Sequence, residues 1–80
     1  MNSKSADLLS QCVSRTMKRY FKDMNGEEPA NLYDMVMAEI EKPLLEVVMR
    51  EAENNQTRAA RMLGINRNTL RKKLKQYHLG

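Results

Sequence analysis

The chain has 80 residues, a net charge of +4 and a single cysteine, Cys12. This length predicts one small domain, and a lone thiol excludes an internal disulfide and makes a metal framework implausible. No stretch approaches the roughly 20 apolar residues of a membrane span, and the start lacks a signal-peptide pattern, which predicts a cytoplasmic protein with no membrane partner. A chain this small buries little surface, so we expect oligomerisation to stabilise it.

Charge is divided unevenly along the chain. Residues 1–53 carry seven basic and ten acidic side chains, a net charge of −3, whereas residues 54–80 carry seven basic and no acidic ones, a net charge of +7. A cationic end of this kind is typical of a protein that binds a polyanion. Double-stranded DNA is the favoured partner, because basic side chains that neutralise phosphates release condensed counterions.

The first predicted helix covers residues 6–24, where apolar residues recur at steps of three and four. Residues 1–5 are expected to be a disordered tail. Asn25-Gly26 is a stop signal, because both residue types tolerate a left-handed backbone. Residues 27–29 then form a short linker that ends in a proline suited to a new helix start.

A second helix is predicted over residues 30–52, with Asn31 and Asp34 as a capping pair. Its apolar residues nearly encircle it, and one partner helix of the same chain cannot cover such a surface. Residues 6–52 are therefore expected to be the dimerisation helices of a homodimer, with this helix at the centre. Pro43 removes one backbone hydrogen bond and should bend the helix.

Residues 55–77 have the pattern of a helix-turn-helix motif. A short helix over residues 56–63 carries two adjacent alanines, Gly64 ends it, and Asn66 caps a basic helix over residues 67–77. Small residues allow two helices to cross closely, and the glycine allows a sharp turn between them.

Residues at the start of a recognition helix normally reach the base edges of DNA. Arg67 suits the two acceptors of guanine, and Asn66, a helix cap in either case, suits the donor and acceptor of adenine. Asn55, Thr57 and Arg58 begin the preceding helix, where side chains and free N–H groups can hold a phosphate. A helical rotation of about 100° per residue places further side chains on the exposed faces. These are Asn68, Arg71, Lys72 and Lys75. Arg61 and Lys73 fit phosphate contacts or solubilising charges equally well.

Several stretches match a known family pattern over about three quarters of the chain. They are Tyr20-Phe21, Asn25-Gly26, Leu32-Tyr33, Pro43-Leu44-Leu45, Asn55-Gln56-Thr57-Arg58-Ala59-Ala60, Gly64-Ile65-Asn66-Arg67 and Thr69-Leu70-Arg71-Lys72-Lys73-Leu74-Lys75. With these residues the chain resembles the Fis (factor for inversion stimulation) family of bacterial nucleoid proteins. The last third of the pattern is shared with the DNA-binding domains of many enhancer-binding activators, whereas the upstream matches favour Fis.

The resemblance implies an all-α fold of four helices, an interlocked homodimer core built from the first two helices, and a C-terminal helix-turn-helix in each subunit. It also implies that DNA bends to accept both recognition helices. The family's DNA contacts map, together with the exposed Arg71, onto Asn55, Thr57, Arg58, Asn66, Arg67, Thr69, Arg71, Lys72, Lys73 and Lys75. Gln76 and Asn68 depart from the family pattern, which has a basic residue and a glycine there.

Two larger departures bear on function. The family carries a mobile N-terminal arm that activates DNA invertases, and this chain has too few residues before its first helix to hold one, so we do not expect recombinase activation. The surface that the family offers to RNA polymerase is basic and contains glycine. Here it reads Glu53-Asn54, which puts a polymerase contact in doubt.

The leading hypothesis is a nucleoid-associated transcription regulator that binds and bends duplex DNA with tolerant sequence preference. One alternative is the DNA-binding module of an enhancer-binding activator, and another is an adaptor whose basic helix binds an acidic protein or membrane. We expect no enzyme, cofactor or metal, because one histidine, one cysteine and dispersed carboxylates provide neither a nucleophile–base pair nor metal-ligand spacing.

Overall fold

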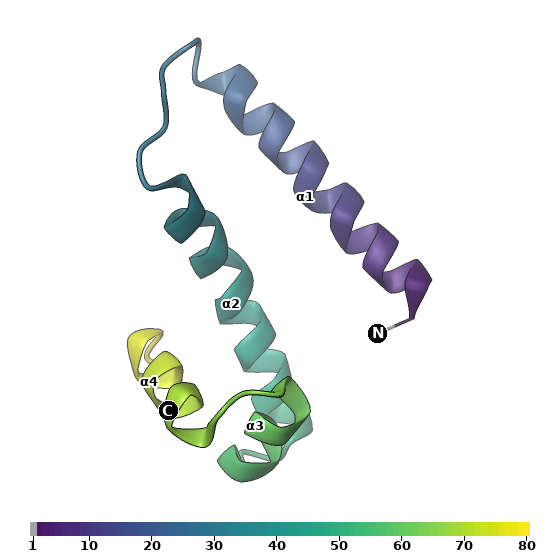
Figure 1. Cartoon of the computed structure of the whole chain (residues 1–80), viewed down its shortest axis with the longest axis vertical. Coiled ribbons are helices and arrows are strands. Elements are labelled where there is room, and N and C mark those ends of the chain that lie inside the picture. The colour runs from purple at the N-terminus through teal and green to yellow at the C-terminus, as the bar shows by residue number, and fades with distance from the viewer. Residues whose placement is uncertain (1) are drawn as a thin grey trace. The chain divides into compact units, whose positions relative to one another are not determined.

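The computed structural model describes residues 2–80, which form four helices and no strand (Figure 1). The helices are α1 (Ser3–Asp23), α2 (Leu32–Glu51), α3 (Gln56–Leu63) and α4 (Arg67–Gln76). The predicted all-α class with four helices is confirmed. The chain divides after Ala30 into two units, so that α2 belongs with α3 and α4. Within residues 2–80 no helix combines the length and apolar character needed to span a bilayer.

Helix α1 begins earlier than predicted. The side chain of Asn2 caps it by accepting a hydrogen bond from the backbone N–H of Ser5 at 2.8 Å, and Ser3 is the first helical residue. The expected disordered tail is therefore wrong for residues 2–5, because an asparagine cap satisfies one of the free N–H groups of the first turn. Met1 lies outside the described residues.

No residue of α1 is buried in the single chain. Leu8 is 60% exposed, and Leu9 and Phe21 are about half exposed. The helix ends at Asp23, one residue earlier than predicted, and the predicted stop at Asn25-Gly26 follows it with positive φ angles of 53° and 84°. Its apolar side chains thus have the periodicity of a packed helix, and α1 by itself buries none of them.

Helix α2 lacks the predicted capping pair. Asn31 precedes the helix in a left-handed conformation, with φ 55° and ψ 35°, and its side chain makes no capping hydrogen bond. The predicted pairing of Asn31 with Asp34 is wrong because a cap needs an extended backbone that aims its side chain at the first turn. Asp34 still lies in that turn, where its charge suits the helix dipole.

The core of residues 31–80 lies where the C-terminal half of α2 meets α3 and α4 (Figure 1). Leu70 and Leu74 of α4 are fully buried. Ala59 and Ala60 of α3 are also buried, as the helix-turn-helix pattern predicted, and their small side chains permit a close helix crossing. The complete buried cluster is Leu45, Ala52, Ala59, Ala60, Leu70 and Leu74.

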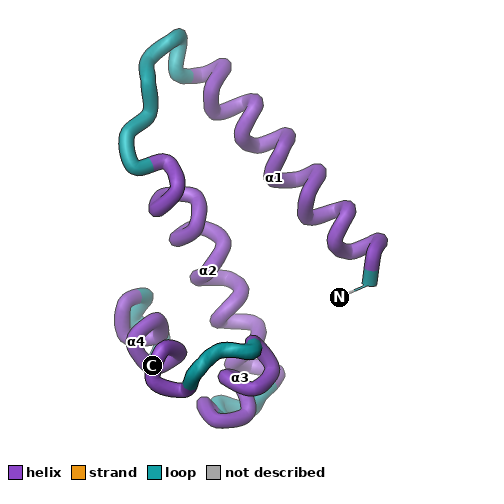
Figure 2. The backbone as a smooth tube through the Cα atoms, in the orientation of Figure 1, coloured by secondary structure: helices purple, strands orange, loops and turns teal. Residues whose placement is uncertain are grey.

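The three helices of this unit end with the same hydrogen-bonding pattern. At the end of α3 the N–H of Ile65 bonds to the carbonyl of Ala60 at 3.0 Å, and the N–H of Gly64 bonds to that of Arg61 at 3.2 Å. This Schellman motif needs a left-handed residue, supplied by Gly64 with φ 74°. Corresponding bonds end α2 and α4, where the left-handed residues are Glu53 and His78. These short turns hold α3 and α4 beside α2 (Figure 2).

Candidate nucleic-acid interface

Helices α3 and α4 and the turn between them form the helix-turn-helix motif. The bounds of α3 are those predicted, and α4 ends at Gln76, one residue earlier than predicted, with Tyr77 as its cap. Leu70 and Leu74 bury one side of α4 against α2 and α3. The opposite side of α4 is consequently left to solvent.

Two asparagines fix the starts of these helices. The side-chain oxygen of Asn55 accepts from the N–H of Arg58 at 3.1 Å, and that of Asn66 accepts from the N–H of Asn68 at 2.7 Å. The predicted cap at Asn66 is confirmed, and Asn55 caps α3 in the same way. Each cap uses the carbonyl oxygen, and the amide NH₂ of each asparagine can still donate to a ligand. The oxygen of Asn66 has a second lone pair, so its two-point contact with adenine stays a prediction.

The exposed side of α4 presents a cationic groove. Arg71, Lys72 and Lys75 line it together with Asn68, and Gln56 at the start of α3 contributes to the same wall. The cations share this surface because their positions on a helix lie within about 100° of one another. Residues 54–80 contain no acidic side chain, so no carboxylate of the motif offsets this charge.

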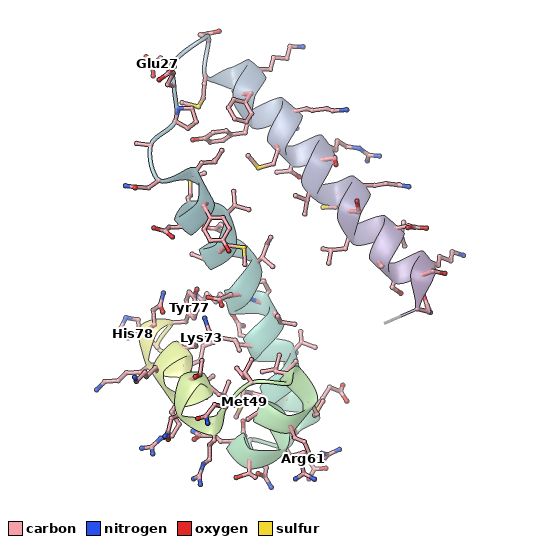
Figure 3. All side chains as sticks on the ribbon, viewed as in Figure 1. Glu27, Met49, Arg61, Lys73, Tyr77 and His78 are labelled. Atoms are coloured by element: carbon pink, nitrogen blue, oxygen red, sulfur yellow. The ribbon has the colours of Figure 1, made fainter. Side chains whose placement is uncertain are left out.

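The remaining predicted contact residues are exposed around the two helix starts. Thr57 and Arg58 lie in the first turn of α3, Arg67 opens α4, and Thr69 lies two residues further along. None of the four makes a side-chain hydrogen bond or ion pair with another described residue. Figure 3 shows Arg61 projecting outward from α3. These four side chains are thus exposed and have no polar partner among the described residues.

Lys73 differs from the other basic residues of α4. Its ammonium group forms an ion pair with Glu41 of α2 at 2.5 Å, and the hydroxyl of Tyr77 donates to the other carboxylate oxygen at 2.5 Å (Figure 3). Glu41 is not among the residues predicted from the sequence. Its partners lie 32 and 36 positions away, and no local pattern indicates that distant pairing.

The three groups alter one another's protonation. The hydrogen bond from Lys73, followed by that from Tyr77, holds the pKa of Glu41 below its ordinary value of 4.5. The hydrogen bond to Glu41 raises the pKa of Tyr77 from 10.0 to about 12. At neutral pH the carboxylate is therefore charged and the phenol keeps its proton.

Comparison with known proteins identifies the family. The model of the bacterial regulatory proteins of the Fis family matches residues 36–77. The chain belongs to the Fis family. It is 55% identical over 71 residues to a Fis-like DNA-binding protein of Neisseria meningitidis, covering 89% of this chain and 90% of that protein.

Other Fis-family relatives show similar identity. A Fis-like DNA-binding protein of Ralstonia nicotianae is 53% identical over 75 residues, covering 94% of this chain and 97% of that protein. The DNA-binding protein Fis of Mannheimia haemolytica is 56% identical over 68 residues, covering 85% of this chain and 69% of that protein. Because these alignments are longer than residues 36–77, the similarity extends beyond the stretch from α2 to α4 that the family model matches.

Across residues 2–80 of this Fis-family chain, no three His, Cys, Asp or Glu side chains are grouped so that they could hold a metal ion. The chemical groups at the interface are instead hydrogen-bond donors and cations. Such groups suit the recognition of phosphates and base edges.

Proposed function

We propose that this protein is a homodimeric, nucleoid-associated regulator of transcription that binds and bends double-stranded DNA with tolerant sequence preference. Membership of the Fis family and the DNA-binding names of its relatives support the choice of ligand. The single observation that carries the proposal is the cationic groove of α4, which has no acidic residue anywhere in the motif.

The dimensions of α4 fit a major groove. A helix of 10 residues is about 15 Å long at roughly 1.5 Å per residue. The major groove of B-form DNA is about 12 Å wide and admits one helix. With Leu70 and Leu74 turned into the protein, the polar side of α4 is the side that would enter.

The contact residues divide into two groups in this proposal. Arg67, at the start of α4, donates to O6 and N7 of a guanine, and Thr69 contacts the DNA beside it. Phosphates are held along α4 and at the start of α3, where exposed side chains and helix N–H groups point outward. The phosphate ligands are Asn55, Thr57, Arg58, Arg71, Lys72 and Lys75, whereas Asn66 contacts an adenine edge beside Arg67.

A second copy of the chain is the proposed partner of the uncovered apolar surfaces. On α2, Leu44 and Val47 are about half exposed and lie on the stripe next to the buried Leu45. The apolar side chains of α1 are similarly open. Because an 80-residue chain with such surfaces gains stability by burying them, we propose that α1 and α2 of two chains pack together.

Two recognition helices in one dimer would place their DNA contacts in two half-sites. If the helices lie closer together than one turn of straight DNA, the duplex must bend to meet both. The energy of bending depends on sequence, so flexible pyrimidine–purine or A/T-rich steps between the half-sites would raise affinity without direct contact. This would give the tolerant preference that we propose.

Selection from a random duplex library, with wild type and Arg67→Ala in parallel, tests the role of Arg67. Loss of the guanine contact should cost roughly 1–3 kcal/mol per half-site and relax preference at that base. Arg61→Ala removes an equal charge from the outer side of α3 and should leave the motif unchanged. Identical motifs from wild type and Arg67→Ala would refute base readout. Stronger binding to anionic vesicles or acidic peptides than to duplex DNA would instead favour the adaptor.

A further inference from the structure

Four of the five cations of α4 lie on two different sides of the helix. Arg71, Lys72 and Lys75 line the cationic groove, whereas Lys73 lines a second groove between α2 and α4, with Glu41 and Tyr77. Lys73 and Tyr77 are one helical turn apart and face α2 (Figure 3). Lys73 is therefore separated from the charges placed for DNA.

Glu41 joins the two helices through both of its carboxylate oxygens. One accepts from the ammonium of Lys73 and the other from the hydroxyl of Tyr77, each at 2.5 Å. The side chains of Lys73 and Glu41 are only 31% and 22% exposed. A charge-assisted pair that is partly shielded from water, and divided between two donors, restricts rotation more than a single exposed ion pair does.

The position of these bonds supplements the apolar packing of α4. Leu70 and Leu74 fix which side of the helix is buried, but apolar contacts are not directional. Hydrogen bonds from Lys73 and Tyr77 to one carboxylate add a directional attachment near the C-terminal end of α4. Together they define both the rotation of α4 about its axis and its angle to α2.

We propose that Glu41 is a positioning residue for DNA binding, and that Glu41, Lys73 and Tyr77 form an α2–α4 brace that persists when DNA is bound. The inference rests on the proposed function. Through this brace, α2 sets the angle at which α4 enters the major groove. Lys73 accordingly pairs with Glu41 within the protein. It does not bind a phosphate, as the family resemblance implied it would.

The brace predicts opposite effects for two acidic residues of α2. Replacing any acidic residue with glutamine makes the protein more positive, which by itself strengthens binding to DNA. Glu39 is exposed and makes no hydrogen bond or ion pair with another described residue, so Glu39→Gln should leave affinity equal or slightly higher. Glu41→Gln should weaken binding about three- to tenfold, because the ionic brace is lost.

Salt dependence separates a brace from a phosphate contact. A side chain that neutralises one phosphate contributes about 0.9 to the slope of log affinity against log salt concentration. Lys72→Gln should therefore flatten the slope. Lys73→Gln should weaken binding about three- to tenfold at every salt concentration while leaving the slope unchanged, because it misplaces α4 without removing a phosphate contact.

The experiment measures affinity for one duplex at several salt concentrations with the full chain and its Glu39→Gln, Glu41→Gln, Lys72→Gln and Lys73→Gln variants. Circular dichroism first establishes that each variant is folded under the assay conditions, which separates positioning from stability. Tyr77→Phe provides a milder variant that removes one hydroxyl and keeps the ring. It should show a smaller loss of affinity with an unchanged slope.

Weaker binding by Glu41→Gln and Lys73→Gln at unchanged slope supports the brace. A slope flattened equally by Lys73→Gln and Lys72→Gln would overturn it, because Lys73 would then bind a phosphate. Unchanged affinity in folded Glu41→Gln and Tyr77→Phe would also overturn it while leaving the proposed function intact. If the wild type did not bind the duplex, or bound it independently of salt, both proposals would be rejected. This outcome is recognised from the wild type alone.

Discussion

Residues 31–80 and α1 differ in how far they bury their apolar side chains. Both contain apolar residues at helical spacing, yet Leu70 is completely buried within the chain and Leu9, on the apolar stripe of α1, is 49% exposed. Residues 31–80 supply three helices that enclose a common core, whereas no residue of α1 is buried. Periodicity therefore indicates that a helix face is suited to burial, but it does not identify the surface that covers this face.

The largest loss of stability is expected when a cavity is made in the core of residues 31–80. Leu70→Ala should lower the free energy of unfolding by about 2–5 kcal/mol, because it removes a buried side chain and leaves a cavity. Met62→Ala is the matched control on α3, where the side chain is 51% exposed, and should cost less than about 1 kcal/mol. Urea unfolding followed by circular dichroism measures both. Equal losses would show that this unit has no distinct core.

A smaller effect is expected where α2 meets the proposed second copy. Val47 is 53% exposed in the single chain, and Val47→Asp would place a charge in the dimer interface. We expect the dimer dissociation constant to rise about 10- to 100-fold, equivalent to roughly 1.4–2.8 kcal/mol.

Analytical ultracentrifugation measures that change, with Met62→Asp as an equally exposed control outside the interface. In the wild type the unfolding midpoint should rise with protein concentration, because folding and association are linked. A wild-type chain that sediments as a stable folded monomer at micromolar concentration would contradict the homodimer.

Local signals in the sequence predicted the helix-turn-helix more accurately than the rest of the chain. Asn55, Gly64 and Asn66 mark helix ends by their own backbone and side-chain chemistry, and the predicted bounds of α3 are those observed. The predicted cap at Asn31 was wrong because asparagine is common both as a helix cap and in the left-handed conformation, and Asn31 adopts the latter. Glu41 was missed because its role depends on residues brought together by tertiary packing.

The left-handed residues at the helix ends of residues 31–80 predict smaller changes in stability. Gly64→Ala should cost about 1 kcal/mol, because an added Cβ disfavours the left-handed backbone while meeting no atom within 4 Å. Glu53→Gly should instead stabilise by roughly 0.5–1 kcal/mol, since Glu53 adopts φ 53° without being glycine.

Glu53→Ala controls for the lost charge and should not stabilise. Thermal unfolding of the three variants measures these differences. A stabilising Gly64→Ala, or a Glu53→Gly no more stable than Glu53→Ala, would show that the left-handed ends do not limit stability.

The smallest effect concerns the titration of the brace. The pKa of Tyr77 is raised from 10.0 to about 12, so its stabilising contribution is complete below pH 10 and is lost as the pH rises through about 12. The pKa of Glu41 is lowered from 4.5, so its contribution is present above pH 4.5 and is lost as the pH falls through the lower folded value.

Tyrosinate absorbance, taken as the difference between wild type and Tyr77→Phe, should place the Tyr77 step near pH 12. In Glu41→Gln the step should move to lower pH, because the negative charge that opposes phenol ionisation is gone. An unmoved step would show that Glu41 does not hold the Tyr77 proton.

The most direct test of DNA recognition by α4 is the salt dependence of duplex DNA binding by the wild type and by the double variant Lys72→Ala/Lys75→Ala. If paired cationic grooves hold about 6–10 phosphates per dimer, log affinity should fall with log salt at a slope near −0.9 per phosphate. The double variant should bind every sequence more weakly, with a flatter slope. Binding that does not change with salt, or an unaltered slope in the double variant, would contradict DNA recognition through this face of α4.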